Sequence, residues 1–194
     1  MISAQQIKEL RERTGAGVSD VKKALEEAKG DMARAQELVE RKWGSSAGKR
    51  EGRATGAGAV DAYIHSNSKI GSMVALLCET DFVARNEDFR VLAHDIAMHI
   101  AAMRPLYLSQ GEVPPEIWQQ EKSRFEEEAK GLGKSPQITE QIIDGKLKAH
   151  FGPLCLLSQP FVKDQDKTVG EVIQSTIGKF GENIKIERFI RFEI

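Results

Sequence analysis

The sequence has little that points to chemistry by a metal or a reactive thiol. It holds only two cysteines, Cys78 and Cys155, and both stand in apolar strings typical of reduced core residues, although a disulfide between them stays open. The histidines have no metal-ligand spacing: His65, His94, His99 and His150. Asp95 and His99 are four residues apart and favour a surface hydrogen bond over an acid–base couple. No serine or cysteine has a histidine and an aspartate in a catalytic motif. We therefore expect no enzyme, no metal site and no cofactor.

The sequence also lacks an excess of charge and any long apolar run. Lys and Arg total 28 and Asp and Glu total 29, so the formal net charge is -1. The net charge gives no overall electrostatic attraction to nucleic acid or an anionic membrane, although it does not exclude local basic patches. The first residues show no basic region followed by an apolar stretch, and no segment approaches transmembrane length. We expect a cytoplasmic protein with no membrane contact and no direct nucleic-acid contact.

Glycine-rich stretches at 44–58 resemble phosphate loops but do not meet their requirements. Gly44 to Lys49 is one residue short of a Walker A loop, and Arg50 stands where Ser or Thr would bind magnesium. The sequence Thr-Gly-Ala-Gly occurs twice, at 14–17 and 55–58. Neither stretch follows a predicted strand, as the dinucleotide-binding fingerprint requires. Without bulky apolar residues, residues 44–58 are predicted to be a flexible linker. The linker has three basic residues, Lys49, Arg50 and Arg53. They could contact a ribosome or RNA, but the composition favours a solvated tether.

Residues 1–43 are predicted to form a three-helix docking module. Ser3 and Gln6 have capping-box spacing at the first helix. Ser19 is expected to cap the second helix, which Gly30 ends, and Asp31 to cap the third. Three short helices give a marginal core, which suits a docking unit better than a catalytic one.

Residues 59–194 are predicted to form an α+β core domain. Two strands at 59–65 and 73–78 form a hairpin, and Asn86 opens a helix with a broad apolar stripe. A helical hairpin is expected at about 114–151, followed by a short buried strand at 154–157. A capping box at Thr168 and Glu171 opens a helix that ends at Gly181. An apolar strand at 184–194 closes the chain, and such a strand is normally paired on both edges or covered by a partner.

One short segment joins a buried strand to a helix. Thr80, Asp81, Phe82 and Val83 follow the apolar run 73–78 and lead to Asn86. An aspartate beside a large aromatic at a rigid edge could enter another protein's ion-dependent site. The same pattern also fits a helix-entry turn with a core phenylalanine, which is the commoner case.

Two separated stretches resemble the family of translation elongation factor Ts. One runs from Ile7 to Leu25 and the other from Cys78 to Asn86, and further matches fall at 159–164 and 181–184. Their order is collinear across nearly the whole chain. The family often carries methionine where this chain has Val18 and Ser19. The chain is also too short for a duplicated core and a long coiled coil, so it resembles the compact form, in which a homodimer supplies the second partner surface.

The resemblance implies a guanine-nucleotide exchange factor for elongation factor Tu, built from a ubiquitin-associated-like module, a linker and a core with an antiparallel sheet. It implies that Asp81 and Phe82, flanked by Thr80 and Val83, intrude near the magnesium and phosphate region of the GTPase. A second set of residues, Arg11 and Val18, is implied to dock on the GTPase domain.

Two alternatives stay open on the residues alone. The helical module could be a peptide-binding adaptor, in which case the segment at Asp81 and Phe82 is structural. The protein could instead bind RNA through its linker, and such binding would weaken steeply with salt.

Overall fold

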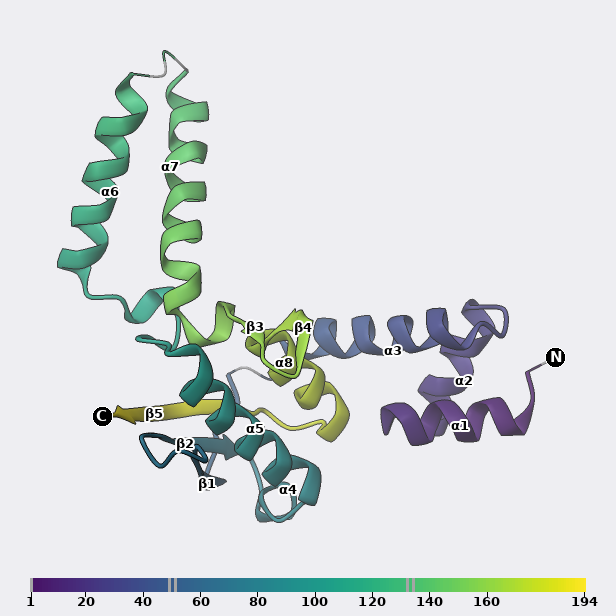
Figure 1. Cartoon of the computed structure of the whole chain (residues 1–194). Coiled ribbons are helices and arrows are strands. Elements are labelled where there is room, and N and C mark those ends of the chain that lie inside the picture. Colours follow the sequence, from purple (N-terminus) through teal and green to yellow (C-terminus); the bar gives the residue numbers. More distant parts are fainter. Residues whose placement is uncertain (1, 49, 51, 132, 134) are drawn as a thin grey trace. The chain divides into compact units, whose positions relative to one another are not determined.

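The structure is a computed structural model that describes residues 2–48, 50, 52–131, 133 and 135–194 (Figure 1). Lys49, one of the basic residues of the expected linker, lies outside the described residues. The chain divides into two compact units, and several elements contribute to both. The first unit comprises residues 1–61, 74–94 and 171–187, and the second comprises residues 62–73, 95–170 and 188–194.

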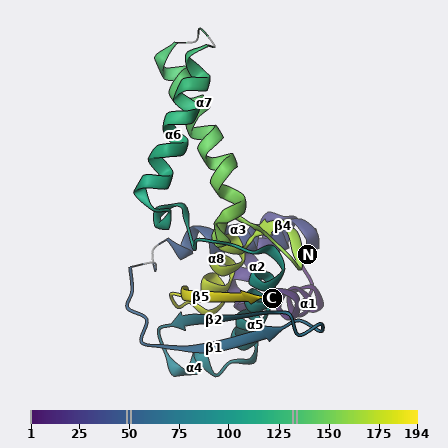
Figure 2. The same cartoon turned by 60° about the vertical axis from the view of Figure 1, so that its left-hand side comes forward.

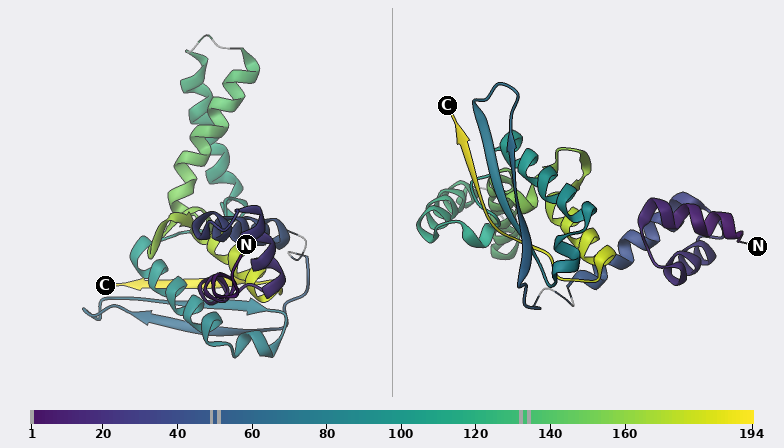
Figure 3. Two further views of the ribbon diagram at one scale, coloured as in Figure 1. Left: turned by 90° about the vertical axis from the view of Figure 1, so that its right-hand side faces the viewer. Right: turned by 90° about the horizontal axis from the view of Figure 1, so that it is seen from below.

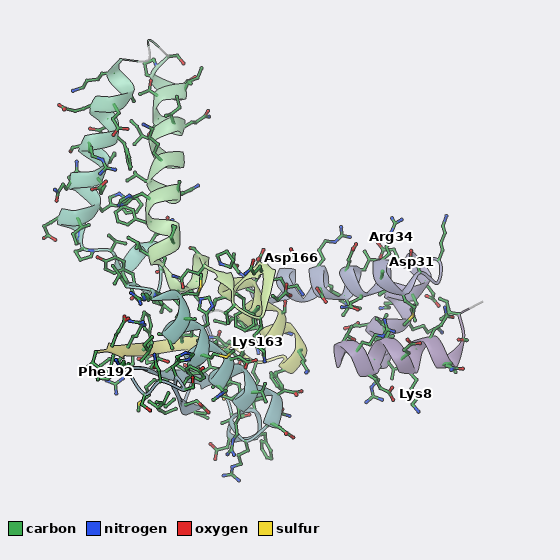
Figure 4. All side chains as sticks on the ribbon, viewed as in Figure 1. Lys8, Asp31, Arg34, Lys163, Asp166 and Phe192 are labelled. Carbon is green, nitrogen blue, oxygen red and sulfur yellow. The ribbon has the colours of Figure 1, made fainter. Side chains whose placement is uncertain are left out.

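The N-terminal helices α1 (Ala4–Thr14), α2 (Val18–Glu27) and α3 (Met32–Ala47) belong to the first unit. Ser3 and Gln6 form the predicted capping box, and Asp31 caps α3 by accepting from the Arg34 amide at 3.1 Å (Figure 4). Apolar side chains on the facing sides of the helices form a buried core: Leu10, Val21, Leu25, Ala35 and Val39. The helices and the Asp31 cap were therefore predictable from local sequence.

Two details of this region differ from the sequence-based expectation. Ser19 was expected to cap α2, but the helix already begins at Val18, and Gly17 is its N-cap without a side-chain bond. Ser19 therefore lies inside the first turn. Helix α3 continues to Ala47, so the first four residues of the expected linker, 44–47, are helical. The stretch contains no proline to end the helix, and its single glycine weakens a helix without breaking it.

The sheet has the strand order β1-β2-β5, with strands at Ala57–Ile64, Ile70–Cys78 and Lys185–Glu193. Neighbouring strands run in opposite directions (Figure 2). Helix α5 (Glu87–Met103) packs on one face of the sheet. In the second unit the Ser72 hydroxyl of β2 donates to the Ala97 carbonyl of α5 at 2.5 Å. In the first unit His94 of α5 lies 2.9 Å from an Asp61 carboxylate oxygen of β1.

Two further helices lie wholly or mostly in the first unit. A short helix, α4 (Asp81–Ala84), follows β2 directly, and α8 (Val169–Phe180) leads to β5. Gly181 ends α8 as predicted, with φ at 75° in the left-handed region that favours glycine.

The helical hairpin of the second unit consists of α6 (Pro115–Lys130) and α7 (Pro136–Phe151), which lie side by side (Figure 3). A short 3₁₀ helix, η1 (Gln110–Glu112), precedes it. Trp118 of α6 stacks on Phe151 of α7 with ring centroids 4.9 Å apart. Phe125, Ile143 and Leu147 complete a core of the hairpin's own. The predicted hairpin at about 114–151 is therefore present.

The prediction of a buried strand at 154–157 is wrong. The segment instead forms two 3₁₀ turns, η2 (Gly152–Leu154) and η3 (Leu156–Ser158), before a small hairpin of β3 (Pro160–Phe161) and β4 (Asp164–Thr168). Cys155 and Leu156 are buried as expected, but burial alone does not distinguish a strand from a turn. The Cys155 and Ser158 amides donate back to carbonyls three residues earlier, whereas the Leu156 and Leu157 amides donate to the Tyr107 and Leu108 carbonyls.

His99 and Asp95 of α5 do not pair with each other, contrary to the expectation of a surface hydrogen bond. His99 is fully buried, and its Nδ1 accepts from the Val162 amide at 3.1 Å. Its Nε2 lies 2.9 Å from the Gln159 side-chain oxygen, so the neutral ring carries its proton on Nε2 and donates there. Asp95 instead forms an ion pair with Lys163 at 2.9 Å. Both residues hold the β3–β4 hairpin to α5.

Candidate functional site

The segment Thr80–Val83, which we call the corner turn, forms the junction between β2 and α5. Thr80 is the N-cap of α4, the single helical turn at Asp81–Ala84. The Arg85 amide donates to the Asp81 carbonyl and the Asn86 amide to the Val83 carbonyl, which closes the turn. Asn86 then accepts from the Asp88 amide at 2.9 Å and opens α5, as the sequence predicts. The corner turn is therefore ordered backbone between two long elements.

Phe82 projects from this turn into solvent, with 90% of its surface exposed. The alternative expectation of a core phenylalanine is therefore wrong. Asp81 is also exposed and pairs with Arg85 at 3.2 Å, four residues along the chain. Such a surface ion pair contributes little, because both partners remain solvated. The structure thus presents an aromatic ring and a carboxylate together on the outside of the turn.

Val83 and Ala84 take the opposite direction. Each is only 8% exposed, because successive residues of a helical turn point about 100° apart. Val83 was expected to join Thr80, Asp81 and Phe82 at a partner surface, but its side chain faces the core. In this structure it anchors the turn from inside.

A carboxylate from a distant part of the chain holds the entry to the corner turn. Glu182 accepts from the amides of Glu79 at 3.2 Å and Thr80 at 3.0 Å. Its second oxygen accepts from the Thr80 hydroxyl at 2.5 Å. The buried Cys78 thiol lies just before these residues and donates to the Thr80 carbonyl. Burial, and then the Glu182 charge, raise the pKa of Cys78, so this thiol is held in its protonated form.

The next residue, Asn183, adds a second connection. Its amide donates to Glu79 Oε1 at 2.6 Å, and its side chain donates to the Arg53 carbonyl at 2.8 Å. The Arg53 guanidinium lies 3.4 Å from the same Glu79 oxygen. Arg53, predicted to be a solvated linker residue, is therefore tied to the end of β2. Sequence reasoning missed the contribution of Glu182 and Asn183, and only the family match at 181–184 pointed to them.

The other expected contact residues lie on the N-terminal helices. Val18 is the first residue of α2 and is 52% exposed, and Arg11 is exposed in the last turn of α1. In the loop between them Ala16 is buried, and its amide donates to the Thr14 hydroxyl at 3.2 Å. Both side chains are accessible, as a docking role requires.

Features of other kinds of site are scarce in the part of the chain that the structure describes. There, no group of three or more His, Cys, Asp or Glu side chains could hold a metal ion. Cys78 and Cys155 are both free and buried, so no disulfide joins them. None of the helices in the described ranges has the length and apolarity to cross a bilayer.

The family model for elongation factor TS matches residues 6–194. The chain is 49% identical to an elongation factor Ts of Acetivibrio thermocellus over 193 residues, which cover 100% of this chain and 90% of that protein. It is 49% identical to the elongation factor Ts of Fervidobacterium nodosum, covering 100% and 98% of the two chains. The corresponding protein of Thermosipho melanesiensis is 47% identical over 194 residues, covering 100% and 99%. With matches that span helices, sheet and corner turn alike, this chain belongs to the elongation factor Ts family.

Proposed function

We propose that this chain is a guanine-nucleotide exchange factor that binds elongation factor Tu with GDP and promotes GDP release during translation elongation in the cytoplasm. It would act by binding alone, without changing a covalent bond, and so would not be an enzyme. One observation carries the proposal: the family's matching segment presents Phe82 and Asp81 on the outside of a rigid turn.

The chemistry of this pair suits the disturbance of a metal-held nucleotide. Magnesium bridges the nucleotide phosphates and the protein, so displacing its ligands weakens the grip on GDP. Phe82 is the apolar wedge, since burying an exposed phenylalanine contributes roughly 1.5–3 kcal/mol. Asp81 would compete for groups around the ion, and its weak pair with Arg85 leaves it available.

The corner turn cannot supply the whole effect. A thousandfold loosening of GDP needs about 4 kcal/mol of coupling, more than one phenylalanine provides. We therefore propose that Arg11 and Val18 on the N-terminal helices add docking surface on the GTPase domain. Reciprocity requires GDP to weaken binding of the factor by the same ratio, which allows the factor to be released and recycled.

We also propose that the chain acts as a homodimer. In the second unit, Ser72 and Arg191 bond to carbonyls of α5, so their neighbours along β2 and β5 point to the opposite face of the sheet. That face carries exposed apolar side chains, among them Phe192 near the C-terminal end of β5 (Figure 4). We call this set the open face: Ile64, Met73, Ile190, Phe192 and Ile194. A second copy would cover it, since an exposed apolar patch of this kind commonly marks a protein–protein interface.

The exchange proposal is tested by the release of fluorescent GDP from elongation factor Tu. The parent chain in catalytic amounts should accelerate release in the presence of excess unlabelled GDP. At equal, sub-saturating concentration Phe82→Ala should slow the accelerated release roughly ten- to hundredfold, the equivalent of 1.5–3 kcal/mol. Asp81→Ala should also slow it. Leu106→Ala, at another exposed apolar residue, is the control and should match the parent.

Two results would contradict these proposals. If Phe82→Ala and Asp81→Ala release GDP at the parent rate, the corner turn is not the intruding element. For the dimer, sedimentation of the parent chain should give twice the monomer mass, and Phe192→Lys should give the monomer. A monomeric parent that still exchanges nucleotide would remove the dimer proposal and leave the exchange proposal intact.

A further inference from the structure

Phe82 and Asp81 are held by few contacts of their own. Phe82 is almost fully exposed, and Asp81 has a surface ion pair with Arg85. Their direction is therefore set by the backbone of the corner turn. That backbone is anchored on the inside by Val83 and Ala84, and at its entry by the bonds to Glu182.

The bonding of Thr80 shows how much of the entry depends on Glu182. An N-cap threonine ordinarily uses its side-chain oxygen to accept from an amide of the first helical turn. Thr80 makes no such bond. Its hydroxyl donates instead to Glu182, which also accepts the amides of Thr80 and Glu79. One carboxylate thus receives three bonds from the two residues that precede α4.

We propose that Glu182 is a positioning residue for nucleotide exchange, acting through the corner turn; this inference rests on the proposed exchange function. Hydrogen bonds to a charged group are stronger than neutral ones, so the carboxylate restricts the backbone that carries Phe82. A turn held in its docking conformation before contact avoids the cost of ordering on binding. Without Glu182 the docking conformation is a smaller fraction of the population, and apparent affinity falls by that fraction.

Asn183 extends the arrangement on the other side of Glu79. Its amide donates to the Glu79 carboxylate, and its side chain donates to the Arg53 carbonyl. The chain segments at 53, 79–80 and 182–183 are thus joined at one point. The end of β2 is therefore fixed on both sides, so that loss of Glu182 alone loosens the turn without releasing the strand.

The experiment measures GDP release from elongation factor Tu as a function of factor concentration. Glu182→Ala should raise the half-saturating concentration about tenfold, which corresponds to the loss of one charged hydrogen bond or more. The maximal rate should stay near that of the parent. Glu182→Gln should recover part of this loss, since its oxygen still accepts the amides and its NH₂ can donate to the Thr80 hydroxyl, although without the charge that strengthens these bonds. Glu187→Ala removes an exposed glutamate of β5 that pairs with Lys185, and should match the parent.

Coupling to Phe82 separates positioning from general structural damage. In a Phe82→Ala background, Glu182→Ala should raise the half-saturating concentration clearly less than in the parent background, because only Asp81 then remains to be positioned by the turn. Losses that multiply in the double variant would overturn the proposal. Thr80→Val, which removes only the hydroxyl donor, provides the same comparison if Glu182→Ala does not fold.

Amide hydrogen exchange in the free protein gives a readout independent of the GTPase. Peptides covering 79–86 should exchange about tenfold faster in Glu182→Ala, whereas peptides of α6 and α7 should keep the parent rate. Unchanged exchange at 79–86 would refute the role of Glu182 even if the parent promotes GDP release. If the parent does not promote GDP release, the proposed function fails, and so does the positioning role in exchange.

Discussion

Truncating two adjacent residues of the corner turn, Phe82 and Val83, should change the free energy of unfolding by very different amounts. Phe82 is 90% exposed and Val83 is 8% exposed, although they are neighbours in one helical turn. Removing an exposed ring away from other contacts changes the free energy of unfolding by no more than about 0.5 kcal/mol. Val83→Ala removes two buried carbons at about 0.8 kcal/mol each, or about 1.6 kcal/mol, and the remaining cavity brings the loss to about 2–2.5 kcal/mol.

The assay is equilibrium unfolding in urea, followed by far-UV circular dichroism, for the parent and both variants. We expect Phe82→Ala to overlay the parent and Val83→Ala to unfold at clearly lower urea. In GDP release the folded Val83→Ala variant should lose less activity than Phe82→Ala, because the buried Val83 side chain supports the turn from inside. Leu106→Ala again serves as the control for loss of an exposed apolar side chain.

A stability loss above about 1.5 kcal/mol for Phe82→Ala would refute this reasoning, because it would mean that the ring packs against its own domain. An unaffected Val83→Ala would equally show that the turn is not anchored from inside. Either result would remove the basis for treating the outer side of the corner turn as a free docking surface.

Three further outcomes are expected. Burial lowers the pKa of His99, so as the pH falls the unfolded chain takes up this proton before the folded chain does. The free energy of unfolding from urea titrations should therefore be constant above about pH 6.5 and fall below that pH by at most about 1.4 kcal/mol per pH unit. His99→Gln should weaken this pH dependence. Gln159→Leu should cost about 2–4 kcal/mol in the same assay, because it leaves His99 and two carbonyls without their partner. Ser3→Ala should speed amide exchange of α1 by roughly fivefold through loss of about 1 kcal/mol at its cap, while β2 keeps its parent rate.

The helices were predictable because their signals are local. Ser3, Asp31 and Asn86 cap the helices that follow them, and Gly181 adopts the left-handed geometry that ends α8, whereas α2 ends at Glu27, before the expected stop at Gly30. The segment at 154–157 was not predictable in the same way. A short apolar run is compatible with any buried backbone, and the hydrogen bonds to Tyr107 and Leu108 that hold these turns come from a distant part of the chain.

The residues of the candidate site were predictable from the sequence, but the directions in which their side chains point were not. Motif resemblance pointed to Thr80, Asp81, Phe82 and Val83, yet the sequence equally allowed a core phenylalanine. Which side chain faces out depends on how the single turn α4 is rotated between β2 and α5. That rotation is set by burial of Val83 and by the bonds to Glu182, whose partners lie more than a hundred positions away.

The sequence by itself determined the family, the order of the long helices and of the strands β1, β2 and β5, and the residues at the corner turn, because caps, apolar periodicity and motifs are written in neighbouring positions. Only the tertiary structure decided that Phe82 is exposed while Val83 is buried, that His99 is a buried donor and acceptor, and that Glu182 receives the bonds of Thr80. These outcomes depend on contacts between segments distant in the chain, and no local pattern encodes which of them will meet.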